Sequence, residues 1–137
     1  MNTYNIKDIN FLNSNLYRQY INSNPKVGFL KIRAYTASEA VPIIGLNVVV
    51  SKIIDNNKII FYEGKTDNSG VIDKISLPAP TLSLDDLNAP NSTTYDISAT
   101  YDDMESKYLV NIYEGVYVVQ TINVIPKMNR MDDNNVY

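Results

Sequence analysis

Between residues 27 and 126 several short segments of the chain have the pattern of β-strands, in which apolar and polar residues alternate with a period of two. Leu30, Ile32 and Ala34, for example, alternate with Lys31 and Arg33. Such alternation is typical of a β-strand that has one face in a core and the other in water. It predicts seven strands, over residues 30–35, 46–54, 59–63, 71–77, 95–101, 108–113 and 116–125.

Turn-forming residues separate these segments. Residues 55–58 (Asp-Asn-Asn-Lys) predict a hairpin, and residues 66–70 end in Gly70, which can adopt a positive φ. Residues 78–80 (Pro-Ala-Pro) predict a break, because proline has no N–H to give to a central strand. Short strands at this spacing predict an all-β fold, a seven-stranded antiparallel β-sandwich.

The ends of the chain lack this pattern. We therefore divide it into an N-terminal arm (residues 1–26), a sandwich domain (27–126) and a polar C-terminal tail (127–137). In the arm, apolar residues recur at helical spacing and predict one short amphipathic helix, which is marginal without a cover. The arm either packs back on its own sandwich or docks on a neighbouring subunit. In the second case the contact residues are Ile6, Ile9, Phe11, Leu12, Leu16, Tyr17, Tyr20 and Ile21.

Composition narrows the chemistry available to this chain. Its 137 residues include no His, no Cys and no Trp. This excludes Ser-His-Asp and Cys-His nucleophiles, thiol redox pairs and ordinary zinc sites. We therefore predict that the protein is not an enzyme and has no cofactor.

Charge and hydropathy exclude two classes of partner. The net charge is -3, and the basic residues are scattered, whereas binding to a phosphate backbone needs clustered Lys and Arg. The longest apolar stretch, residues 43–50, is far shorter than the roughly 20 residues that span a bilayer. We therefore predict no nucleic-acid partner and no membrane span. The N-terminal residues lack the apolar core of a secretion signal, which favours cytoplasmic synthesis.

Two groups of carboxylates are candidates for a metal site or a reaction. Asp85-Asp86 and the acidic residues of 102–105 could gather Ca²⁺, which takes carboxylate oxygens from loops, although their spacing is not that of an EF-hand. The alternative, which we favour, is solvated acidic turns that protect strand edges. A glycosidase pair of carboxylates would need a cleft between them, and nothing in the sequence predicts one.

Tyrosine is unusually abundant, with 11 residues. Most tyrosines in strands fit core or cross-strand positions. An exposed subset would offer rings and hydroxyls to a glycan, which is the alternative interpretation. Six lie in or beside the predicted strands: Tyr35, Tyr62, Tyr101, Tyr108, Tyr113 and Tyr117.

Several short segments together resemble the carboxypeptidase regulatory-like (transthyretin-like) β-sandwich. They are residues 28–32 (Gly-Phe-Leu-Lys-Ile), residues 41–48 (Val-Pro-Ile-Ile-Gly-Leu-Asn-Val) and residues 66–70 (Thr-Asp-Asn-Ser-Gly). In that family Pro and Gly precede the second strand, and a Thr-Asp-x-x-Gly turn lies between later strands. The resemblance implies an immunoglobulin-like, transthyretin-like sandwich over about residues 28–126.

The second half of the domain resembles a narrower subgroup, found at the N-terminus of Firmicutes spore cortex-lytic and peptidoglycan-binding proteins. The segments concerned are residues 77–80, 83–85, 95–97, 112–115 and 120–126. The chain departs from the family after the fifth strand, where residues 102–106 replace a usual Gly-aromatic pair. No peptidase, amidase or peptidoglycan-binding domain follows. The resemblance therefore implies a non-catalytic accessory domain or pro-domain.

These observations together predict a non-catalytic structural subunit of a larger assembly, such as a spore surface, an extracellular structure or a phage particle. It would join neighbours, copies of itself or other subunits, through its arm and its sandwich edges. The alternative rests on the domains that this family accompanies: an accessory module that binds peptidoglycan or regulates its hydrolases.

Overall fold

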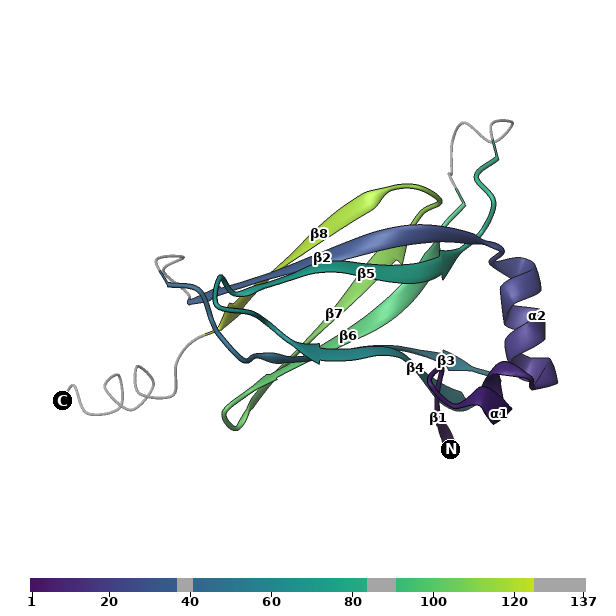
Figure 1. The fold of residues 1–137 in the computed structure, drawn as a ribbon, viewed down its shortest axis with the longest axis horizontal. Coiled ribbons are helices and arrows are strands. Elements are labelled where there is room, and N and C mark those ends of the chain that lie inside the picture. Colours follow the sequence, from purple (N-terminus) through teal and green to yellow (C-terminus); the bar gives the residue numbers. More distant parts are fainter. Residues whose placement is uncertain (37–40, 84–90, 125–137) are drawn as a thin grey trace.

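The computed structural model describes residues 1–36, 41–83 and 91–124. Within these ranges two sheets face each other, a five-stranded sheet of order β1-β4-β3-β6-β7 and a three-stranded sheet of order β5-β2-β8 (Figure 1). The elements in chain order are β1 (Thr3–Asn5), α1 (Ile9–Leu12), α2 (Asn15–Ser23), β2 (Lys26–Thr36), β3 (Asn47–Ile54), β4 (Asn57–Lys65), β5 (Val71–Ala79), β6 (Thr93–Tyr101), β7 (Met104–Ile112) and β8 (Tyr117–Val124).

The core lies between the two sheets. Leu30, Ile32 and Ala34 of β2 are completely buried, and so are Val48 and Val50 of β3. The residues between them along each strand are less buried, as the period of two predicts. The predicted all-β sandwich is therefore confirmed.

The strand directions differ from the prediction of a wholly antiparallel sandwich. β2 pairs with β8 in parallel, and β1 pairs with β4 in parallel, while the other pairs are antiparallel. The alternation of side chains encodes which face of a strand is buried, and it does not encode the direction of a neighbour that is distant in sequence. β1, which comes from the arm, was also not among the predicted strands.

The predicted hairpin at residues 55–58 is confirmed. Asp55 and Asn56 both have positive φ, 49° and 62°, and they join β3 to the antiparallel β4. A two-residue turn with both central residues in this region matches the twist of the flanking strands, and Asp and Asn tolerate it better than most residues.

Two boundaries differ from the prediction. Pro78 lies within β5, opposite Val27 of β2, where we predicted a break. β5 is an edge strand, and an edge strand tolerates proline because one row of its N–H groups has no partner strand. β7 begins at Met104 instead of residue 108, because a tight turn with Asp102 at φ 58° pairs Tyr101 directly with Met104.

The arm folds onto one end of the sandwich. β1 adds a strand beside β4, and α2 stands across the gap between the two sheets at the same end (Figure 1). The side chains of Asp8 and Ser14 cap the N-termini of α1 and α2. The one helix predicted for the arm is therefore two short helices separated at residues 13–14. The tail, residues 127–137, lies outside the described residues.

Candidate functional site

A buried chain of hydroxyl groups fastens the arm to the sandwich. The Tyr20 hydroxyl of α2 donates to the Tyr95 hydroxyl of β6 over 2.7 Å, and Tyr95 donates to the Pro78 carbonyl of β5 over 2.5 Å. Phe61 packs against both rings, with centroid distances of 5.4 Å to Tyr20 and 5.2 Å to Tyr95. One helix and both sheets therefore meet in this cluster.

Asn24 extends the same fastening at the end of α2. Its Nδ2 donates to the Tyr20 carbonyl over 3.0 Å, and its Oδ1 accepts from the Thr93 hydroxyl. Asn24 is 7% exposed, so these bonds satisfy a side chain that would otherwise be buried without partners.

Burial keeps both tyrosines protonated. Desolvation is the main cause that raises the pKa of Tyr20 to about 12, although the hydrogen bond to Tyr95 works in the opposite direction. Desolvation also raises the pKa of Tyr95, with a further contribution from the Tyr20 charge. At neutral pH the chain of hydroxyls is uncharged.

The structure places most of the predicted contact residues of the arm against the chain's own core. Phe11 and Tyr20 are buried in it, while Ile6, Leu16, Tyr17 and Ile21 are partly buried and pack against it; Leu12 is partly buried, and Ile9 is 69% exposed. This is the first of the two arrangements that the sequence left open. A contact between the arm and a neighbouring subunit stays a prediction, in which Ile9 is the exposed member.

The edges of the two sheets differ in how they are protected. β1 is only three residues long, and β5 carries Pro78 and a bulge at Asp73 and Lys74. β7 carries the charges of Glu105 and Lys107. Short strands, bulges, proline and charge are the features that keep an open edge from pairing with another chain.

The fourth edge, β8, has none of these features. Its eight residues, Tyr-Val-Val-Gln-Thr-Ile-Asn-Val, include no charge, no proline and no glycine. Its register with β2 is unbroken from one end to the other. Tyr117 is 54% exposed and Val119 is 51% exposed, so these two apolar side chains of the edge face solvent.

The backbone of β8 also has a free side. The Phe29 N–H donates to the Val116 carbonyl over 3.0 Å, and bonding residues alternate along a parallel ladder. The N–H and C=O groups of Tyr117, Val119 and Thr121 therefore point away from β2. Among the described strands none pairs with β8 on that side.

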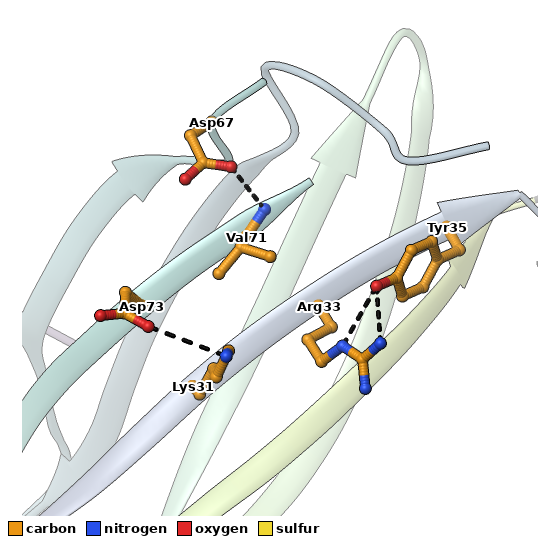
Figure 2. A network of polar contacts seen from close by, with 6 residues as sticks. All are labelled: Lys31, Arg33, Tyr35, Asp67, Val71 and Asp73. Carbon is orange, nitrogen blue, oxygen red and sulfur yellow. Dashed lines mark hydrogen bonds and ion pairs between the residues drawn. The ribbon is translucent and has the colours of Figure 1, made fainter. Parts of the chain in front are cut away.

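The outer face beside β8 is aromatic and cationic. The rings of Phe29 and Tyr117 stack at 4.8 Å, and the Lys74 Nζ lies 4.7 Å from the centroid of Phe29. Further along β2, Nε and Nη2 of Arg33 both donate to the Tyr35 hydroxyl, at 3.1 and 2.7 Å (Figure 2).

One ion pair crosses the same face. Lys31 Nζ lies 3.8 Å from Asp73 Oδ1, with 35% and 87% of the two side chains exposed (Figure 2). A pair this exposed contributes little to stability. Two further cations, Arg33 and Lys74, lie among the described side chains of this face. The face therefore carries positive charge although the net charge of the whole chain is -3.

The tyrosines divide between core and surface. Tyr62, Tyr101 and Tyr108 pack against the core, as expected for most of them. Tyr35 and Tyr117 lie on the outer face of the three-stranded sheet with the cations described above. Tyr35 is half-buried and Tyr117 is 54% exposed, so Tyr117 is the exposed one of the two and could offer its ring to a glycan.

The candidate calcium ligands are only partly described. Asp85 and Asp86 lie outside the described residues. Within residues 1–36, 41–83 and 91–124 no group of three or more acidic side chains is placed to hold a metal ion. None of the helices in these same ranges is long and apolar enough to cross a membrane.

A scan against models of known protein families finds no match, and a search of curated proteins finds none either. Among solved structures, this chain is similar to the 5-hydroxyisourate hydrolase of Klebsiella pneumoniae. The two are 16% identical, the TM-score is 0.47, and the likeness covers 70% of this chain and 90% of that one. The narrower resemblance to the Firmicutes subgroup stays a prediction.

This likeness corrects one prediction. We predicted that the chain is not an enzyme, and the solved structure to which it is similar is named as a hydrolase. A non-catalytic role cannot be inferred from this kind of fold, because one fold hosts many functions. The absence of His and Cys excludes the catalytic systems that need them, and it does not exclude catalysis as such.

Proposed function

We propose that this protein is a subunit that assembles with further copies of itself by strand addition at β8. The observation that carries the proposal is the contrast between the four edges. β1, β5 and β7 each have a feature that discourages pairing, whereas β8 is long, uncharged, regular and exposed. The sequence analysis predicted that copies join through the arm and the sandwich edges, and the proposal limits the contact to the edge at β8.

A second copy is the partner that fits β8 best. Antiparallel pairing of two β8 strands would satisfy the outward backbone groups of both and join two three-stranded sheets into one. It would also bury the exposed side chains of Tyr117 and Val119 against the β8 strand of the second copy. The arm contributes less to this proposal, because Phe11 and Tyr20 are already buried in their own chain.

The mass of the full-length protein in solution, measured by size-exclusion chromatography with light scattering over a wide concentration range, tests the proposal. We expect the mass to rise with concentration. Val119→Lys brings two like charges, one from each copy, to the joint and weakens association by about tenfold or more. Thr121→Pro removes an outward N–H without removing a bond to β2, and it weakens association too.

The matched control is Leu109→Lys, which replaces another exposed apolar residue on an edge strand, β7. We expect it to associate like the unmodified protein. A monomeric mass at every concentration would refute the proposal. So would equal dissociation by Leu109→Lys and Val119→Lys, because the effect would then come from surface charge alone.

A second candidate, a module that binds peptidoglycan, is favoured by one observation. The stacked rings of Phe29 and Tyr117, flanked by Lys74, form an exposed amphipathic surface of the kind that sugars contact. Retention on purified sacculi tests it, with Tyr117→Ala as the variant. Retention that survives this substitution would exclude Tyr117 as the contact, and no retention at all would exclude the function.

A further inference from the structure

The outer face of the five-stranded sheet contains a hollow of about 350 Å³. It lies on the side of the molecule opposite the three-stranded sheet, over strands β4, β3, β6 and β7. Side-chain length explains it: Ser51, Asp96 and Ser98 are short and stand on the two central strands, while Lys58 and Leu109 are longer and stand on the flanking strands. The short residues form a floor and the long ones form walls.

The register of the strands places the polar groups of the floor side by side. Ser51 of β3 is directly opposite Asp96 of β6, and Asp96 is opposite Leu109 of β7. The pairing of β3 with β4 shifts between Val50 and Ser51, at the position of the hollow. Such irregularities commonly redirect a side chain beside a binding site.

Ser51 differs from the other buried polar residues. Asn24, Ser51 and Thr66 are the three polar residues buried among the described parts of the chain. Asn24 and Thr66 both make hydrogen bonds to the protein, at 3.0 Å to the Tyr20 carbonyl and at 2.6 Å to the Ile43 carbonyl. Ser51 is 6% exposed and lines the hollow, and no hydrogen bond joins its hydroxyl to any described residue. That hydroxyl is available to a ligand.

The charged groups of the hollow fall into two sets. Glu105 is satisfied, because it accepts from the Ser98 hydroxyl over 2.9 Å and lies 3.8 Å from Lys107 Nζ. Asp96 and Lys58 have no such partner among the described residues, although Asp96 is half-buried. Toward a ligand, the hollow thus offers one carboxylate and one ammonium group that no described residue pairs with.

We infer that this hollow binds a small zwitterion, an α-amino acid with an apolar side chain. The ammonium group of the ligand would lie at the Asp96 carboxylate and the Ser51 hydroxyl, which stand together on the floor. Its carboxylate would meet the Lys58 ammonium on the wall. Ile53 and Leu109, which are 47% and 69% exposed, offer apolar contacts to its side chain. The inference is independent of assembly at β8.

The test is a titration of the isotope-labelled full-length protein with L-leucine, followed by amide chemical shifts. Two probes carry half of the zwitterion each: leucine methyl ester, which has only the ammonium group, and 4-methylvalerate, which has only the carboxylate. We expect saturable shifts centred on Ser51, Asp96 and Lys58 with leucine, and weaker binding of both halves.

Substitutions separate the two ends of the ligand. Asp96→Asn should weaken leucine binding by about ten- to a hundredfold, the loss of a charged hydrogen bond, and leave 4-methylvalerate unaffected. Lys58→Gln should weaken leucine and spare the methyl ester. Asp73→Asn, the same exchange at an exposed carboxylate of the other sheet, is the matched control and should change nothing.

Three results would overturn the inference. The first is the absence of saturable shifts with leucine. The second is a set of shifts located away from the hollow. The third is equal leucine affinity of the Asp96→Asn variant and the unmodified protein, provided that both give the same circular dichroism spectrum.

Discussion

The hydroxyl chain between α2 and the sandwich predicts an unequal effect of two similar substitutions, Tyr20→Phe and Tyr95→Phe. Tyr95 both accepts from Tyr20 and donates to the Pro78 carbonyl, and its side chain is completely buried. Removing its hydroxyl leaves the buried Tyr20 donor and the part-buried Pro78 carbonyl without this partner. At about 1–3 kcal/mol for each unsatisfied group, Tyr95→Phe should lower the free energy of unfolding by about 2–6 kcal/mol.

Tyr20→Phe should cost less. Tyr95 keeps its bond to the Pro78 carbonyl, so only one hydrogen bond is lost, with a net contribution of about 0.5–1.5 kcal/mol. The double variant should be more stable than the sum of the two losses predicts, because Tyr95→Phe strands the Tyr20 hydroxyl and Tyr20→Phe then removes it.

The assay is urea-induced unfolding followed by circular dichroism, with the slope m checked for constancy across the variants. Tyr113→Phe, a tyrosine outside the buried pair, is the control and should change stability little. If Tyr20→Phe proved as costly as Tyr95→Phe, or if the two losses were simply additive, the hydroxyl chain would not be the contact that fastens the arm.

Two further predictions concern pH and glycine. Burial raises the pKa of Tyr20 from 10.0 to about 12, so the stability that its protonated hydroxyl contributes is complete below pH 10 and is lost as the pH rises to about 12. Urea unfolding at several alkaline pH values should therefore show the free energy of unfolding fall by about 3 kcal/mol over this range. Tyr20→Phe should make this fall smaller. Gly28→Ala should destabilise the fold by more than 3 kcal/mol, roughly the upper range for overpacking, because its Cβ would collide with the Tyr113 carbonyl. Gly45→Ala, where nothing lies within 4 Å but φ is +78°, should cost only about 1 kcal/mol of backbone strain, and thermal melts of both variants compare the two.

The strands of this fold could be predicted because their cause is local. The alternation around Leu30, Ile32 and Ala34 states which side chains are buried, and the structure buries all three. The break predicted at residues 78–80 fails for a different reason. Proline is excluded from a strand only where its missing N–H has a partner, and whether β5 is central or at an edge depends on the whole sheet.

The candidate sites depended on contacts between distant parts of the chain. The apolar stripe of the arm indicated that another surface covers it. It could not indicate that Tyr20 contacts Tyr95, because the two residues are 75 positions apart in the sequence and a local pattern carries no information on such contacts. In the sequence nothing distinguishes Ser51 from other serines in strands, because its place beside Asp96 depends on the register of β3 with β6. The β8 edge did have a local signal, since residues 116–125 contain no charged residue, and the sequence analysis did not use it.

Protection of the strand edges connects the fold to the proposed assembly. The arm protects one edge of the five-stranded sheet, because β1 covers β4 and Phe11 and Tyr20 hold the arm in place. On the three-stranded sheet, the bulge and Pro78 protect β5 in another way. The chain thus protects its other edges, but β8 remains regular and uncharged. β8 is therefore the edge suited to pairing with another copy. If β8 is where copies join, substitutions that loosen the arm should lower stability and leave association at β8 intact, whereas Val119→Lys should do the reverse.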